Sequence, residues 1–453
     1  MKKQLVIIGG GAAGFFCAVN AARMNPALKV TLIEKTNKLL AKVKVSGGGR
    51  CNVTHACFDI IEMSKRYPRG QHFVKKSFHQ FFTTDTISWF EERGVKLKTE
   101  KDGRMFPVTD SSDTIIQCLL NEATKYGVEI LMMKEVKNIN VQRSPKESSR
   151  TIFNVLQRSP QGQSSSGEII TADFVCSASG GYPKSSMFDW LKELGHTIEE
   201  PVPSLFTFNL PASPSLKLQR SKAGQAGFPN HPITKLMGVS VERAKVKILH
   251  ITIGTKLEEV GPLLITHWGL SGPAVLRLSA WGARELKIKN YELKISINWL
   301  PDYNEENLRK EIQSLRKSTA SHKLINKNKF GLPARLWEFL AEQSGIKKEW
   351  RWADLPSVEQ NLFVKNLCSY ACDVKGKTTF KEEFVTAGGI KLNEVDANTM
   401  MSKKIPNLFF AGEVLDVDGI TGGFNFQHAW TSGFVAAKTI SAGALKGTEQ
   451  YSQ

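Results

Sequence analysis

The chain has 453 residues and carries 61 Lys and Arg against 43 Asp and Glu, a formal net charge of +18. This length exceeds the usual size of a single hydrophobic core, so we expect two or three domains. Seven cysteines without a C-x-x-C pattern argue against a disulfide framework and against a metal site, and no apolar run reaches the roughly 18 residues of a membrane span.

The first elements of the chain predict a dinucleotide-binding unit. An apolar strand runs into Gly9-x-Gly11-x-x-Gly14, a helix begins near Ala12, and a second strand ends at Glu34. Gly9 permits a tight turn, Gly11 lets the backbone approach a pyrophosphate, and Gly14 lets the helix pack on the strand. The helix N-terminus attracts phosphate, and Glu34 is spaced to accept hydrogen bonds from a ribose. Because the strand begins by residue 4, we expect no signal peptide and a cytoplasmic protein without a membrane partner.

The sequence pattern then alternates predicted helices with predicted strands, before a β-rich stretch begins. Helical spacing at 71–93 and 112–126, with short strands up to residue 177, predicts a parallel sheet with helices on both faces. From about residue 201, β-like runs between Pro and Gly clusters predict a barrel or sandwich. Helical spacing returns at 304–317, 333–344 and 356–371.

The α/β pattern resumes near residue 384, which indicates a discontinuous domain. We predict a nucleotide-binding domain over 1–199 and 385–453, interrupted by an insert that is β-rich over 200–302 and 350–384 and helical over 303–349.

The C-terminal part favours FAD over a nicotinamide cofactor. A second strand and glycine turn lead into a helix that follows Gly422-Gly423. FAD needs two separate binding regions in the protein, one for its ADP half and one for its ring. A helix beginning near Gly423 would direct its N–H groups at the ring edge where negative charge develops on reduction. No second Gly-x-Gly-x-x-Gly motif is present for NAD(P)H, so we expect that reductant to bind only transiently.

Longer sequence blocks carry a resemblance to a known family. They are S-G-G-G-R-C-N-V-T at 46–54, T-H-W-G-L-S-G-P at 266–273 and A-G-E-V-L-D-V-D-G-I-T-G-G-F-N-F-Q at 411–427, with matches also at 103–108 and 385–390. The chain resembles, over essentially its whole length, the BaiN/YhiN-type FAD-dependent oxidoreductases. These are also grouped as aminoacetone-oxidase-family flavoproteins and are distantly similar to fumarate reductase flavoprotein subunits. The resemblance implies non-covalent FAD in a Rossmann-like domain, with an inserted β-barrel and a small helical subdomain.

The resemblance also implies residues that hold the cofactor. It places the pyrophosphate at Gly9, Gly11, Ala12, Ala13 and Gly14, the ribose at Glu34 and Lys35, and adenine at the backbone of Val136. The backbone of Gly47, Gly48, Gly49, Arg50, Cys51 and Asn52 would run alongside the flavin. The ribityl chain would lie at Gly412, Glu413 and Asp416, and the ring at Gly422, Gly423, Phe424 and Asn425. Two positions depart from the family pattern: His55 stands where Asn is common, and the stretch 179–186 is shorter than usual.

No catalytic residue is assigned, because the flavin itself carries the hydride. Arg50 could lower the pKa of Cys51, although simple packing near the ring is the favoured role for that thiol. His267 lies in a Gly- and Pro-rich loop, where an imidazole suits proton transfer as well as a structural role.

The charge excess makes nucleic acid a candidate partner, because a basic protein attracts polyanions. The most one-sided stretch, 309–329, is nevertheless typical of a solvated helix face, and no RNA-binding signature with interleaved aromatic residues accompanies it. We therefore expect an oxidoreductase that moves a hydride between FAD and a small organic substrate, with NAD(P)H or O2 as the other redox partner. The alternatives are a flavoprotein acting on RNA, as in tRNA modification, and a non-catalytic flavin-bound scaffold or sensor. The oligomeric state does not follow from the sequence.

Overall fold

The computed structural model describes residues 2–143, 151–158, 168–211, 231–249, 257–378 and 385–449. The chain divides into two compact units, which are Met1–Pro203 with Lys381–Gln453, and Ser204–Phe380. No helix of the described part is long and apolar enough to cross a membrane.

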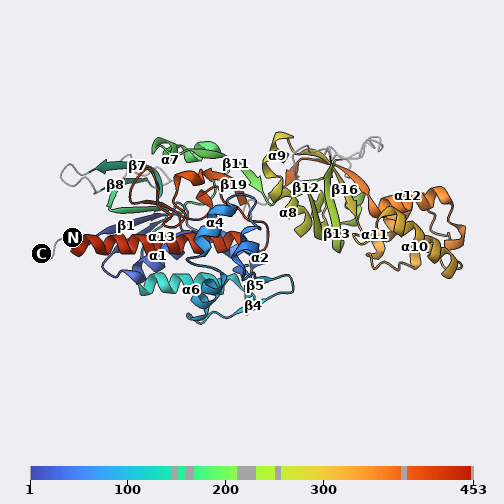
Figure 1. Cartoon of the computed structure of the whole chain (residues 1–453), viewed down its shortest axis with the longest axis horizontal. Helices are drawn as coiled ribbons and strands as arrows, with labels where there is room; N and C mark the ends of the chain where they lie inside the picture. The colour runs from blue at the N-terminus through green and yellow to red at the C-terminus, as the bar shows by residue number, and fades with distance from the viewer. Residues whose placement is uncertain are drawn as a thin grey trace, which may run out of the picture. The chain divides into compact units, whose positions relative to one another are not determined.

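The first unit is built on a five-stranded parallel sheet (Figure 1). All neighbouring strands are parallel, in the order β20 (Leu408–Phe410), β10 (Phe174–Ser177), β1 (Gln4–Ile8), β2 (Lys29–Ile33) and β6 (Glu129–Leu131). Their side chains are almost all buried in β1, β2, β10 and β20, as expected when both faces of a parallel sheet are covered. The predicted α/β fold is confirmed.

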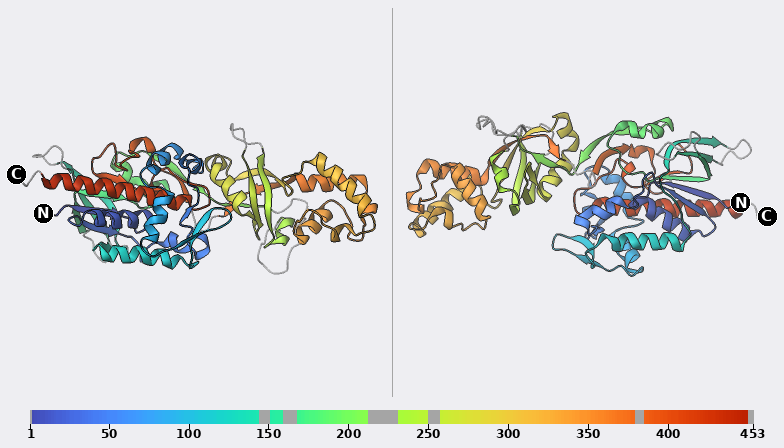
Figure 2. Two further views of the ribbon diagram at one scale, coloured as in Figure 1. Left: turned by 60° about the horizontal axis from the view of Figure 1, so that its bottom comes forward. Right: turned by 180° about the vertical axis from the view of Figure 1, so that it is seen from behind.

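Two helices from opposite ends of the chain pack side by side in this unit. They are α1 (Ala12–Met24) and α13 (Phe424–Glu449), drawn in blue and red in Figures 1 and 2. Gly433 permits the close approach, because a Cβ added there would lie 2.6 Å from the carbonyl oxygen of Ala13. The N-terminal and C-terminal segments therefore form one folded unit.

The crossover from β6 to β10 is an antiparallel meander of β7 (Glu135–Arg143), β8 (Thr151–Arg158) and β9 (Glu168–Ala172), which confirms the short strands predicted in this part of the chain. Polar and apolar residues alternate in these strands, which is a strand period. The helix predicted over 71–93 is two helices, α4 (Gln71–Phe78) and α5 (Thr83–Glu91), because the Asp85 carboxylate accepts a hydrogen bond from the Phe82 backbone N–H (2.6 Å) and starts a new helix.

The second unit contains a seven-stranded antiparallel sheet in the order β17-β16-β13-β14-β15-β12-β18. Its members are β12 (Thr207–Asn209), β13 (Ser240–Leu249), β14 (Glu258–Ile265), β15 (Gly269–Ser271), β16 (Glu292–Asn298), β17 (Tyr370–Lys375) and β18 (Lys377–Thr378). The two strands at the ends of this order, β17 and β18, are separated in the chain by Gly376 alone. The sheet must therefore curl until its ends meet, which makes it barrel-like.

The helical subdomain of the second unit consists of α10 (Glu305–Ser318), α11 (Ala334–Gln343) and α12 (Ser357–Cys368). Leu308, Ile312 and Leu315 of α10 are buried at helical spacing, as predicted. The third predicted helix was too long, because Tyr370, Cys372 and Val374 alternate inward as part of β17.

Candidate functional site

The first glycine segment forms the turn between β1 and α1. Gly9 has a φ of +111°, and a Cβ added there would lie 2.3 Å from the carbonyl oxygen of Ala178. A Cβ at Gly14 would lie 2.0 Å from the carbonyl oxygen of Gly9, whereas one at Gly11 would meet no atom within 4 Å. Packing within the protein thus requires Gly9 and Gly14, but nothing in the protein itself requires Gly11.

Glu34 fixes this turn in the structure. Its Oε2 accepts a hydrogen bond from the backbone N–H of Gly10 (2.8 Å), and its Oε1 accepts from the backbone and hydroxyl of Thr36 (2.9 Å each). The Lys134 N–H donates to the Glu34 carbonyl (3.0 Å), which ties the start of β7, and with it Val136, to the end of β2. Lys35 is exposed, with its ammonium 5.5 Å from the Tyr182 ring centroid. Binding of a ribose by Glu34 and Lys35 stays a prediction.

The second glycine segment, residues 47–49, forms the end of the short helix α2 (Ala41–Gly49), where the backbone angles of Ser46, Gly47 and Gly48 are no longer helical. Gly47, Gly48 and Gly49 have φ of 59°, 70° and 84°, and a Cβ at Gly48 or Gly49 would meet no atom within 4 Å. The N–H of Leu40, just before α2, donates to the Gly10 carbonyl (2.8 Å). The start of α2, which leads to the second glycine segment, therefore lies against the turn that follows β1.

Arg50 and Cys51 have separate surroundings. The Arg50 guanidinium lies 4.0 Å from the Phe106 ring centroid and donates to Glu100 (2.6 Å). Cys51 is fully buried, and burial raises the pKa of its thiol to about 12, although a hydrogen bond with Ser46 opposes the shift. A thiol in this environment stays protonated at neutral pH, which favours packing over nucleophilic chemistry.

The C-terminal glycine pair contacts the residues that follow the second glycine segment. The groups around the Asn52 side chain assign its amide orientation: its oxygen faces the Gly423 N–H and accepts from it (2.9 Å), and its nitrogen donates to the Thr54 carbonyl (3.1 Å). The Gln427 amide oxygen, one turn into α13, accepts from the Thr54 hydroxyl (2.6 Å). Asn425 closes the loop before α13 with two hydrogen bonds to the Gly419 backbone (2.8 and 2.9 Å).

Neighbouring residues hold the same loop in place. The carbonyl of Phe424 accepts from the buried Tyr67 hydroxyl (2.6 Å), and its ring stacks on His55 with centroids 4.8 Å apart. Gly422 has a φ of +140°.

The turn after β20 contributes Gly412, Glu413 and Asp416. Gly412 has a φ of +73°, and a Cβ there would lie 2.8 Å from the Ala13 Cβ, so this turn abuts the start of α1. Glu413 accepts from the Thr386 N–H (3.0 Å) and pairs with the Lys42 ammonium (2.5 Å). Asp416 is buried, and its N–H donates to the Ile390 carbonyl (3.1 Å).

Two buried polar residues at this site, Thr386 and His428, were not among the site residues predicted from the sequence. The hydroxyl of Thr386, beside Glu413, is buried and has no hydrogen-bond partner among the described residues. Thr386 lies in the block 385–390, which matches the family pattern, and that match could have indicated a role at the site. His428 is fully buried, and burial lowers its pKa to about 4 although a Gly412 backbone contact opposes the shift. Neither ring nitrogen completes a hydrogen bond within the described part of the chain, so the lowered pKa favours a neutral imidazole at neutral pH.

His267 belongs to the second unit. Its ring lies 3.6 Å, centroid to centroid, from that of Trp268. A role in proton transfer stays a prediction.

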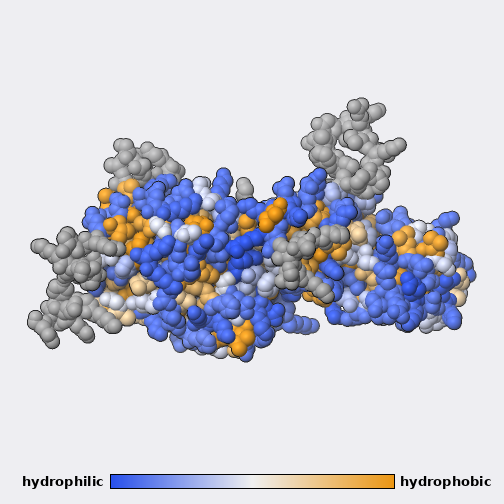
Figure 3. Space-filling model, turned by 45° about the horizontal axis from the view of Figure 1, so that its top comes forward, coloured by the Kyte–Doolittle hydropathy of each residue, from blue (hydrophilic) through white to orange (hydrophobic). Residues whose placement is uncertain are grey.

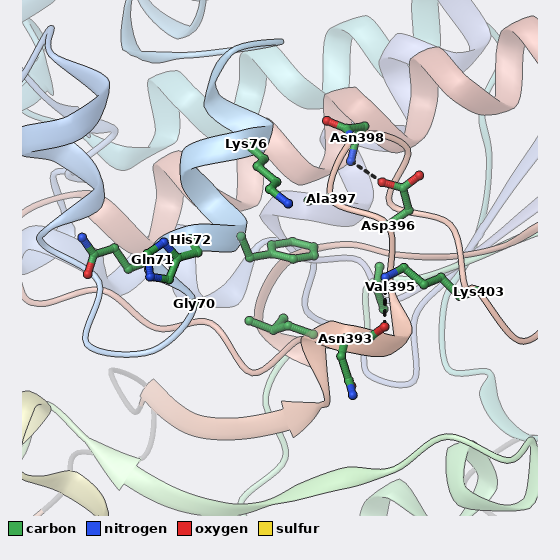
Figure 4. Close-up of a pocket in the computed structure, with 12 residues that line it drawn as sticks. Gly70, Gln71, His72, Lys76, Asn393, Val395, Asp396, Ala397, Asn398 and Lys403 are labelled. Atoms are coloured by element: carbon green, nitrogen blue, oxygen red, sulfur yellow. Dashed lines mark hydrogen bonds between the residues drawn. The ribbon is translucent and has the colours of Figure 1, made fainter.

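A separate cavity of about 440 Å³ lies in the first unit between α4 and residues 392–403 (Figure 4). Lys76, Asp396 and Lys403 line it together with apolar side chains such as Phe73. None of the residues predicted to hold the cofactor lines this cavity.

The chain is similar to known proteins over nearly its whole length. A family model described as HI0933-like protein Rossmann domain matches residues 3–439. The "Ribosomal RNA dihydrouridine synthase" of Escherichia coli (strain K12) is 30% identical over 445 residues, covering 96% of this chain and 98% of that protein. The "3-dehydro-bile acid delta(4,6)-reductase" of Clostridium scindens is 26% identical, covering 97% and 99%. A solved flavocytochrome c3 fumarate reductase in an open conformation has a TM-score of 0.49 and 15% identity, over 98% of this chain and 78% of that one.

Proposed function

The chain belongs to the HI0933-like Rossmann-domain family, whose members are flavin-dependent oxidoreductases, and from this premise we propose that it holds FAD non-covalently and moves a hydride between FAD and a small organic substrate. NAD(P)H or O2 would be the second redox partner. All seven cysteines are unpaired, which suits a reducing compartment such as the cytoplasm.

The observation that carries this proposal is the meeting of glycine segments from both ends of the chain. Leu40 ties the start of α2, which ends in the segment 47–49, to the turn at Gly10, and Asn52, which follows that segment, is hydrogen-bonded to Gly423. The resulting site fits FAD, because Gly11 has an ordinary φ of −92° and a Cβ there would meet no atom of the described protein within 4 Å, so an approaching ligand accounts for this glycine. Gly48 and Gly49 also leave open space around a Cβ, although their positive φ by itself favours glycine.

The helix termini suit the charges of FAD. α1 has no side-chain cap and no acidic residue in its first turn, so its first backbone N–H groups are left to bind a pyrophosphate. α13 begins at Phe424, and the positive end of its dipole stabilises negative charge beside it. FAD, when bound, supplies hydride transfer at N5 of its ring.

The direction of the reaction is proposed from the names of the relatives. A delta(4,6)-reductase and a dihydrouridine synthase both add hydrogen across a carbon–carbon double bond. In a 3-dehydro bile acid and in uracil, that bond is conjugated to a carbonyl group. We therefore favour reduction of such a bond, with NAD(P)H as the hydride source and a proton supplied to the neighbouring carbon.

Anaerobic mixing tests the proposal. Purified protein loaded with FAD is expected to lose its visible flavin absorbance on addition of NADH or NADPH, and to regain it with a panel of small unsaturated ketones. If the flavin is not reduced by either nicotinamide and not reduced by any saturated product of the panel, the proposed oxidoreductase function is wrong.

RNA is a second candidate substrate, and two observations favour it. A ribosomal RNA dihydrouridine synthase is 30% identical over nearly the full length of both chains, and the net charge is +18. The test is incubation of the FAD-loaded protein with NADPH and uridine-containing RNA, followed by nucleoside analysis. Dihydrouridine in that RNA supports this candidate, whereas unchanged uridine under conditions where small ketones are reduced rejects it.

A further inference from the structure

Two separate stretches of the helical subdomain carry a strong excess of positive charge. Residues 316–329 contain one Arg and four Lys with no Asp or Glu, and residues 347–351 contain two Lys and one Arg with one Glu. Three of these eight cations have partners: Arg316 donates to Gln360, Lys329 pairs with Glu311, and Lys348 pairs with Glu338. Several of the others form no ion pair with a carboxylate in the part of the chain that the structure describes.

The tertiary structure places the two stretches against each other. Lys323 and Arg351 are directly opposite in an antiparallel bridge, the Leu324 N–H donates to the Trp350 carbonyl (3.1 Å), and the Trp352 N–H donates to the His322 carbonyl (3.0 Å). Like charges directly opposite each other in such a pair destabilise it. Neither side chain forms an ion pair within 4 Å in the described structure, although the Asp354 carboxylate accepts a hydrogen bond from the Arg351 backbone N–H (3.0 Å).

Trp350 adjoins the Lys323–Arg351 bridge in the chain. It is half-buried and packs partly against the hydrophobic core, and the Lys347 ammonium lies 5.8 Å from its ring centroid. Lys323, Lys327, Lys347 and Arg351 are all exposed. The subdomain also presents a largely hydrophilic face in the space-filling view (Figure 3). We call Lys323, Lys327, Lys347, Trp350 and Arg351 the basic surface.

We propose that the basic surface binds single-stranded RNA, with phosphates on the four cations and a base against the indole of Trp350. A polyanion relieves the repulsion between Lys323 and Arg351, and an aromatic ring among cations is the arrangement that binds single strands through stacking and charge. An anionic membrane would use the cations but not the ring. The inference rests on the second function proposed above, because it names where an RNA substrate would dock.

The test uses the full-length, FAD-loaded protein and a fluorescent single-stranded RNA of about 20 nucleotides, with affinity measured by anisotropy at several salt concentrations. Four phosphate contacts predict that the logarithm of the affinity falls with the logarithm of salt at a slope of roughly −2.8. The double variant Lys323→Gln/Lys327→Gln is expected to bind at least tenfold more weakly and to reduce the slope by roughly 1.4. Trp350→Leu, which keeps an apolar contact with the core, is expected to weaken binding with the slope unchanged.

The control is Lys310→Gln/Lys329→Gln, which removes the same charge from the same subdomain at lysines already paired with Glu306 and Glu311. It is expected to change RNA affinity less than twofold. Equal weakening by both double variants, full affinity in Lys323→Gln/Lys327→Gln, or tighter binding to phosphatidylserine vesicles than to RNA overturns the proposal. Flavin absorbance and thermal midpoints confirm that each variant is folded. RNA binding without dihydrouridine formation would reject the second function while leaving the basic surface in place.

Discussion

The Asn52 amide oxygen accepts a hydrogen bond from the Gly423 N–H at 2.9 Å, which joins a loop near the N-terminus to the start of the last helix. Gly423 has a φ of +92°, and a Cβ there would lie 2.5 Å from the carbonyl oxygen of Thr54. This contact holds the two ends of the chain together where the flavin ring is proposed to bind.

The first prediction concerns this contact. Gly423→Ala adds a methyl group against a backbone carbonyl, and overpacking of this kind costs about 1–3 kcal/mol beyond the strain of a positive φ. The thermal midpoint and the FAD content of the purified protein should both fall. Gly94→Ala is the matched control, because Gly94 also has a positive φ (+78°) but a Cβ there meets no atom within 4 Å. Equal effects of the two variants would show that the close approach at Gly423 is unimportant.

A second prediction separates cofactor binding from folding. Gly11 has a φ of −92° and open space around a Cβ, so Gly11→Val should leave the unfolding free energy of the cofactor-free protein within about 0.5 kcal/mol. The same variant should lose most bound FAD, because the side chain blocks the pyrophosphate. Gly14→Ala should instead prevent stable folding, since its Cβ would lie 2.0 Å from the Gly9 carbonyl oxygen. A Gly11→Val protein with full flavin absorbance would contradict the proposed pyrophosphate position.

The third prediction concerns Cys51. Because burial raises the pKa of its thiol to about 12, the thiolate is scarce at neutral pH. Cys51→Ala should therefore keep the rate of flavin reduction by NAD(P)H within about twofold, with a moderate loss of stability from the cavity. Stopped-flow absorbance measures the rate. A hundredfold loss in a folded, FAD-loaded variant would assign the thiol a chemical role.

A fourth prediction concerns pH and a buried network in the first unit. Glu394 accepts hydrogen bonds from His196 (3.0 Å) and from the Thr197 N–H (3.0 Å), and it pairs with Lys404 (2.7 Å). Burial raises the Glu394 pKa, but the hydrogen bonds from Lys404, Thr197 and His196 outweigh it, and the pKa falls from 4.5 to about 2. A lowered carboxyl pKa stabilises the fold above 4.5, and this stability is lost as the pH falls towards 2.

Thermal midpoints measured between pH 7 and pH 3 should therefore fall more steeply for the native chain than for Glu394→Gln. His196 acts in the same direction, because burial lowers its pKa despite the nearby Glu394, so acid also protonates a buried imidazole. Glu306→Gln, which breaks an exposed pair with Lys310, should leave the pH profile unchanged. Identical slopes for the native chain and Glu394→Gln would refute the assignment.

The sequence by itself determined the features that depend on neighbouring residues. The spacing of Gly9, Gly11 and Gly14 between two apolar strands identified the dinucleotide turn, and the helical period of Leu308, Ile312 and Leu315 identified α10. The family blocks indicated an FAD-dependent oxidoreductase with a discontinuous Rossmann-like domain. Such patterns are local, because turns and helix faces are set by residues within a few positions of one another.

Only the tertiary structure decided the properties that depend on distant groups. Arg50 is adjacent to Cys51 in sequence, yet burial controls the thiol, and Glu34 holds the Gly10 N–H in addition to its predicted ribose role. The pairing of Asn52 with Gly423, and of Lys323 with Arg351, joins segments whose sequences contain no sign of each other. Burial, protonation and pairing are set by whatever the fold brings within a few ångströms, and that neighbourhood comes from packing rather than from spacing along the chain.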